Sequence, residues 1–206
     1  MSRQTDPTEA KFLLDVREHV MTVVRDDGVD RHLRFRKPGT YCMGFDIITW
    51  PGYLCYTGDM GTYVFTRLED MFEFFRTDRK YRPELPGLKI NRSYWAEKCV
   101  GVDRGGIKEF SKERFREQVE YWIGEDRIGN PPSDELREAI EDDVYSHLDD
   151  GQYAAMQAAI DFEHEGFRLT DFWEADSTEY TFHFTWCCYA LAWAILKYDE
   201  STVGKK

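Results

Sequence analysis

Residues 45–76 constrain the fold more than any other stretch of the chain. Three short runs within it, at 45–50, 53–57 and 63–66, are rich in β-branched and aromatic residues and contain no internal Gly or Pro. Such a composition is typical of β-strands. Because the turn-forming sequences Pro-Gly and Gly-Asp-Met-Gly separate the runs, the stretch predicts a three-stranded antiparallel meander.

Segments on both sides extend this meander. Apolar residues recur at Leu68, Met71, Phe72 and Phe75, which is the spacing of a helix with one apolar stripe. Upstream, residues 20–25 and 31–36 have the composition of two more strands, joined by an Asp-Gly hairpin signal. We therefore expect an antiparallel sheet of about five strands with a flanking helix, while the type of segment 90–102 stays open.

The remainder of the chain is predicted to be mainly helical. Ser111 and Ser133 precede apolar residues at helical spacing and are expected to cap two helices, and a third helix follows Gly151. Residues 180–198 are apolar nearly all round, which predicts a buried aromatic C-terminal helix. Its almost continuously apolar part, residues 182–196, is too short for a membrane span. The prediction is a single α+β domain over residues 1–206, with a sheet-rich half (1–108), an acidic helical half (109–179) and a core helix (180–199).

Charge is distributed unevenly along the chain. The formal net charge is -12, yet residues 109–179 contain 21 acidic and 6 basic residues, whereas residues 1–108 contain 16 acidic and 18 basic ones. An acidic surface repels nucleic acid and attracts basic protein surfaces, although such residues also serve simply as a solvated helix face. The candidate partner-binding residues are Glu135, Glu138, Glu141, Asp142, Asp143, Asp149 and Asp150.

The basic residues form a weaker opposite pole. They comprise Arg25, Arg31, Arg34, Arg36 and Lys37, together with Arg76, Arg79, Lys80 and Arg82. Neighbouring acidic residues dilute the field of this pole, so we expect no direct contact with nucleic acid. Five cysteines without a Cys-x-x-Cys pair, and no secretion signal at the start, favour reduced thiols and a cytoplasmic location.

No established catalytic motif occurs in the sequence, and we expect neither a metal ion nor a cofactor. The best metal-like cluster, Glu163-His164-Glu165, consists of consecutive side chains, which point in different directions. Asp59, in the predicted turn, and His183 are weak catalytic candidates. The alternatives are that the Asp59 carboxylate bonds to its own turn backbone and that His183 is a core residue, so a protein that is not an enzyme is favoured.

Three segments resemble an uncharacterised family of small accessory proteins encoded by bacteriophages and prophages. They read FDIITWPGYLCYTGDMGTYVFTRLEDMFEFFR at 45–76, DFWE at 171–174 and YTFHFTWCCYALAWAILKYD at 180–199. The resemblance covers the sheet-rich half and the last helix. It supplies no catalytic residues, and it implies an accessory phage protein that acts in the cytoplasm of the host.

In that setting the acidic half favours one function over two others. The leading hypothesis is an inhibitor of host defence, anti-CRISPR-like or anti-restriction, that mimics DNA and covers a basic nucleic-acid-binding site of a host complex. The first alternative is a phage enzyme that acts on a nucleotide or nucleic acid through Asp59 and His183. The second is a structural or regulatory phage protein that forms a homodimer through exposed aromatic side chains.

Overall fold

The computed structural model describes residues 6–81, 86–124 and 129–203. It divides into two compact units, which we call the sheet unit (Met1–Ile107 with Tyr180–Lys206) and the helical unit (Lys108–Glu179). These boundaries lie within one residue of those expected between the sheet-rich half, the acidic half and the core helix. The expectation that all 206 residues form one domain stays a prediction.

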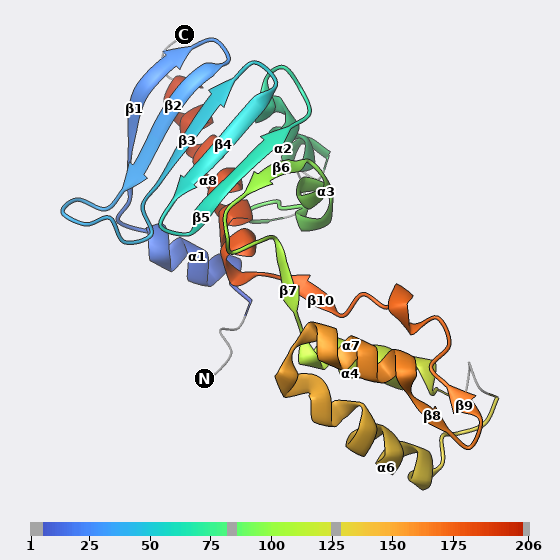
Figure 1. Cartoon of the computed structure of the whole chain (residues 1–206). Helices are drawn as coiled ribbons and strands as arrows, with labels where there is room; N and C mark the ends of the chain where they lie inside the picture. Colours follow the sequence, from blue (N-terminus) through green and yellow to red (C-terminus); the bar gives the residue numbers. More distant parts are fainter. Residues whose placement is uncertain (1–5, 82–85, 125–128, 204–206) are drawn as a thin grey trace. The chain divides into compact units, whose positions relative to one another are not determined.

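The sheet unit is built on a six-stranded antiparallel sheet in which every strand pairs with its neighbour in the chain (Figure 1). The strands are β1 (Val20–Asp27), β2 (Asp30–Arg36), β3 (Phe45–Trp50), β4 (Tyr53–Gly58), β5 (Gly61–Thr66) and β6 (Cys99–Val102). The mixed α+β class and the five predicted strands are confirmed. The sixth strand, β6, comes from segment 90–102, whose type was left open. Local sequence could not predict this strand, because it forms by pairing with β5, more than thirty positions away in the chain.

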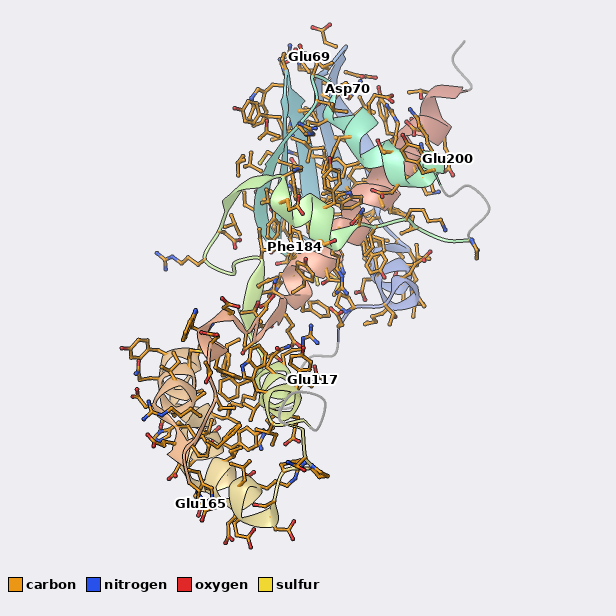
Figure 2. The ribbon with its side chains drawn as sticks, turned by 90° about the vertical axis from the view of Figure 1, so that its right-hand side faces the viewer. Glu69, Asp70, Glu117, Glu165, Phe184 and Glu200 are labelled. Carbon is orange, nitrogen blue, oxygen red and sulfur yellow. The ribbon has the colours of Figure 1, made fainter. Side chains whose placement is uncertain are left out.

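Helices α1 (Glu9–Val16), α2 (Met71–Tyr81), α3 (Arg92–Glu97) and α8 (Phe182–Val203) complete the sheet unit. The predicted flanking helix begins at Met71, so Leu68 lies outside it and is 42% exposed. The carboxylate of Asp70 explains this start, because it accepts the Phe72 backbone N–H at 2.9 Å and so caps the first turn. The same carboxylate receives two hydrogen bonds from Arg31, and Figure 2 shows Asp70 at the beginning of α2.

The core of the sheet unit lies between the sheet and α8. Figure 1 shows the helices of this unit on one face of the sheet, with α8 running behind the strands. Trp186 of α8 meets Phe45 edge-on, with ring centroids 5.8 Å apart, and Trp193 lies 5.4 Å from Phe35. Phe45 and Phe35 also stack on each other at 5.0 Å. The predicted buried aromatic C-terminal helix is therefore confirmed.

The helical unit has a separate core and is predominantly helical. Its described elements are β7 (Lys108–Phe110), α4 (Lys112–Trp122), α6 (Asp134–Asp143), the 3-10 helix η1 (Tyr145–Asp150), α7 (Gln152–Asp161), β8 (Glu163–His164), β9 (Phe167–Arg168) and the 3-10 helix η2 (Phe172–Glu174), followed by β10 (Thr178–Tyr180), whose last residue belongs to the sheet unit. The hydroxyl oxygens of Ser111 and Ser133 accept backbone N–H groups from the first turns of α4 and α6, which confirms both predicted caps.

The interior of the helical unit follows the predicted periodicity. Leu136 and Ile140 of α6 are buried, and so are Ala155 and Ala159 of α7. Within the described ranges, no helix of either unit is long and apolar enough to cross a membrane.

Removing the Phe45 ring should destabilise the sheet unit strongly. The ring is fully buried and contacts aromatic side chains of both the sheet and α8. We expect Phe45→Ala to lower the free energy of unfolding by about 3–5 kcal/mol in urea titrations followed by circular dichroism. Tyr81→Ala is the control, because Tyr81 is 81% exposed and its loss should change stability by less than about 0.5 kcal/mol. Similar losses in the two variants would contradict the assigned core.

Candidate functional site

Helix α6 carries a continuous row of carboxylates on its solvent side. Residues three and four positions apart lie on the same face of a helix, so Glu138 lies between Glu135 and Asp142. All three side chains are exposed, while Leu136 and Ile140 point into the core. We call Glu135, Glu138 and Asp142 the acidic row. Asp143 is exposed too, but it follows Glu138 by five positions and therefore points to another side of the helix.

The seven predicted partner-binding residues differ in how far they are neutralised. Glu141 pairs with Arg116 at 3.3 Å, Asp149 with Lys112, and Asp150 with His147 at 3.4 Å. Among the residues that the structure describes, Glu138, Asp142 and Asp143 pair with no Lys, Arg or His side chain. Of the seven, the carboxylates without a basic partner therefore all lie on α6.

Glu135 has a local role at the start of α6. Hydrogen bonds from its own backbone N–H and from the Ser133 hydroxyl lower the pKa of its carboxyl group. A carboxylate in the first turn of a helix is also stabilised by the helix dipole. Glu135 therefore stays ionised and adds its charge to the acidic row.

The described residues of the basic pole pair with carboxylates of the sheet unit. Asp199 binds both Arg76 and Arg79, and Glu73 binds Lys80. The remaining pairs are Arg25 with Asp27, Arg31 with Asp70, Arg34 and Arg36 with Asp46, and Lys37 with Glu18. Arg82 lies outside the described residues. These pairs reduce the field that the pole presents to phosphate groups.

Asp46 is the most enclosed of these carboxylates. It lies on the face of the sheet opposite α8, since its neighbours Phe45 and Ile47 point into the core. It is only 7% exposed and accepts hydrogen bonds from Arg34 at 3.0 Å and Arg36 at 3.3 Å, with His32 at 2.7 Å. Burial alone would raise the pKa of Asp46, but the hydrogen bonds of Arg34 and His32 outweigh it, so the pKa is lowered.

An open hollow of about 520 Å³ brings the two weak catalytic candidates together. The turn at Asp59 and the N-terminal end of α8 at His183 both line it. His183 is exposed, so the alternative that it is a core residue is wrong. Asp103 and Arg104 also line this hollow, and no local pattern predicted this, because they come from the loop after β6, which is distant in the sequence from both Asp59 and His183.

The carboxylates of the hollow hold loops in place. Asp59 accepts the backbone N–H of Met43 at 2.7 Å, so it binds a neighbouring loop and not its own turn. Asp103 accepts N–H groups from Thr62 at 2.9 Å and Gly105 at 2.8 Å. Gly61 leaves room for Asp103, because a Cβ atom there would lie 2.6 Å from its Oδ2 atom. These hydrogen bonds give both carboxylates a structural role.

A catalytic cysteine and a metal site at residues 163–165 find less support than the hollow. Burial raises the pKa of the Cys187 and Cys188 thiols, which keeps them protonated and poorly nucleophilic. Glu163 of the suggested metal cluster pairs with Arg168. In the described part of the chain, no three His, Cys, Asp or Glu side chains are grouped so that they could hold a metal ion.

Comparisons of the chain with protein-family models, with curated proteins and with solved structures find no match. The geometry of the acidic row and of the hollow is therefore the basis for assigning a function.

Neutralising Asp46 should weaken the sheet unit in a pH-dependent way. Because its pKa is lowered from 3.8 on folding, the ionised carboxylate stabilises the fold above about pH 4, and this contribution is lost as the pH falls through the folded-state value. We expect Asp46→Asn to cost about 2 kcal/mol at pH 7 and much less at pH 2.5, measured by urea unfolding. Asp27→Asn, in an exposed ion pair, should cost less than about 0.5 kcal/mol at both pH values. An equal cost of Asp46→Asn at both pH values would contradict this account.

Removing the Asp59 carboxylate tests its structural role. We expect Asp59→Ala to lower the free energy of unfolding by about 1–2 kcal/mol, because the Met43 N–H loses a charged acceptor. Urea unfolding measures the loss. His183→Ala serves as the comparison, since His183 lines the same hollow but is exposed, and its loss should leave stability nearly unchanged. Wild-type stability of Asp59→Ala would remove the structural explanation and return Asp59 to the catalytic candidates.

Proposed function

We propose that the protein is an inhibitor that binds a nucleic-acid-binding complex through its acidic helical unit. The observation that carries the proposal is the acidic row of α6, in which Glu138 and Asp142 have no cationic partner within the described residues. In the setting implied by the phage-protein resemblance, the partner is a host defence complex of the CRISPR or restriction type. The inhibitor binds it stoichiometrically in the host cytoplasm.

The spacing of the acidic row suits a surface that binds phosphates. From Glu135 to Asp142 the helix rises about 10 Å, so the three carboxylates follow one another at about 5 Å along the axis. One DNA strand carries a phosphate every 3.4 Å of helix axis. The charge density of the row is therefore lower than that of a DNA strand but comparable to it. A basic groove that binds nucleic acid offers Lys and Arg side chains to such a row.

The distribution of charge supports a protein partner over nucleic acid. The helical unit repels phosphate, and the described basic pole of the sheet unit is already paired with carboxylates of the same unit. A partner with a basic surface gains attraction at the helical unit without breaking any of these pairs. Direct binding of DNA or RNA is therefore not part of the proposal.

An enzyme is the second candidate, and one observation favours it. Asp59 and His183 line the same open hollow, where a carboxylate and an imidazole could exchange protons with a nucleotide. Against this, the Asp59 carboxylate already accepts a backbone hydrogen bond from Met43. Loss of a nucleotide-directed activity in Asp59→Ala, with the fold intact, would favour the enzyme over the inhibitor.

A homodimer formed through exposed aromatic side chains is the third candidate. Tyr153 and Trp173 are both exposed and belong to the helical unit. Pairing two such units would bring like charges together, which costs free energy at low salt. Size-exclusion chromatography with light scattering distinguishes a dimer from a monomer.

Reversing the charge of the acidic row should abolish partner binding. We expect the double variant Glu138→Lys and Asp142→Lys to recover at least tenfold less of the defence complex than the wild type recovers from a nuclease-treated host lysate. Wild-type recovery should fall as the salt concentration rises, and the variant should lose most of this dependence.

The matched control reverses two exposed carboxylates of the sheet unit. Glu69→Lys with Glu200→Lys changes the net charge by the same amount, yet should leave recovery of the partner unchanged. Equal loss in both double variants would mean that only net charge matters. Unchanged recovery with the acidic row reversed, or recovery of this protein alone, would refute the proposed docking surface for the host that is tested.

A further inference from the structure

Helix α7 buries its small apolar side chains and exposes its large ones, which is the opposite of the usual arrangement. Its small residues Ala155 and Ala159 are fully buried, while the large residues Tyr153 and Ile160 are 82% and 39% exposed. Met156, between them in the sequence, is partly buried. A helix that only contributes to a core buries its largest apolar side chains. In α7 the apolar surface of Tyr153 and Ile160 is instead exposed to solvent.

The exposed side chains form a row and are not scattered singly. Tyr153 and Ile160 are seven residues apart, which places them on the same face of α7, two turns from each other. Met156 lies three residues after Tyr153 and borders the same face. Single exposed apolar residues are common on protein surfaces, whereas a contiguous row of them marks an interaction surface.

The surroundings of this row determine which partner fits it. The sequence contains no Lys or Arg between Arg137 and Arg168, a stretch that includes all of α7. Asp149 and Asp150 before α7 are paired with Lys112 and His147, whereas Asp161 at its end pairs with no basic side chain among the described residues. A second copy of the chain would bring an equally acidic surface to the row and be repelled. A protein with a basic rim around an apolar depression would match both the row and its flanks.

We propose that the α7 row, formed by Tyr153, Met156 and Ile160, is the centre of the interface with a basic protein partner, where Tyr153 inserts into an apolar depression. This inference rests on the proposed function, because it adds the point of strongest contact to the acidic docking surface. Tyr side chains are enriched among the few residues that dominate interface affinity, and surrounding charges mainly set association rate and specificity.

Site-specific photo-crosslinking tests the proposal in the full-length chain. Tyr153→p-benzoylphenylalanine keeps an aromatic side chain in the α7 row, and Tyr81→p-benzoylphenylalanine is the matched control, since the two tyrosines are 82% and 81% exposed. After irradiation in a bacterial host that carries defence systems, mass spectrometry identifies the crosslinked peptides. We expect position 153, and not position 81, to capture a peptide from a Lys- and Arg-rich surface of another protein. We also expect Tyr153→Ala to reduce co-purification of that protein about tenfold.

The outcomes separate this inference from the proposed function. A crosslink from position 153 to this same chain, the same products from positions 153 and 81, or no crosslink at 153 would overturn it. If reversal of the acidic row abolishes partner recovery and Tyr153→Ala leaves it intact, the proposed function stands and the α7 row is not its centre. If position 153 captures a basic protein that binds no nucleic acid, the α7 row stands as an interface and the proposed function fails.

Discussion

The packing of aromatic side chains from α8 against the inner face of the sheet holds the sheet unit together. Phe45 is at its centre, with Tyr56 at 5.3 Å and Trp186 at 5.8 Å between ring centroids. Phe12 of α1 reaches Trp186 at 5.0 Å, so both ends of the chain contribute to one core. Because α8 follows the helical unit in the sequence, the sheet unit is completed only after residues 108–179 have been synthesised. The helical unit is therefore an insertion into the chain of the sheet unit.

Charged side chains are arranged differently in the sheet unit and in this insertion. In the sheet unit, enclosed carboxylates collect basic side chains, as Asp46 does with Arg34 and Asp199 does with Arg76. Such pairs orient neighbouring strands and helices, and they add little net field. In the helical unit the carboxylates outnumber basic residues by 21 to 6 over residues 109–179, and among its described residues Glu138, Asp142 and Asp143 pair with no basic side chain. The largest excess of negative charge is consequently carried by the insertion.

The hollow and the acidic row use carboxylates in opposite ways. Asp59 and Asp103 accept hydrogen bonds from the backbone N–H groups of Met43 and Thr62, and these bonds hold loops of the sheet unit in place. Among the described residues, the carboxylates of Glu138 and Asp142 pair with no basic side chain and accept no hydrogen bond from a loop. Residues that do not stabilise the fold are free to serve binding, and this contrast supports α6 over the hollow.

Local sequence determined the elements, and tertiary contacts decided the sites. The meander, the caps at Ser111 and Ser133 and the buried face of α6 were predictable, because turn chemistry and periodicity depend on residues a few positions apart. The sixth strand, the partners of Asp46 and the shared hollow of Asp59 and His183 were not, since each joins residues far apart in the chain. The exposure of Tyr153 belongs to the same class. Alanines on the other side of α7 face the core, and only the packing of the helical unit selects which side is buried.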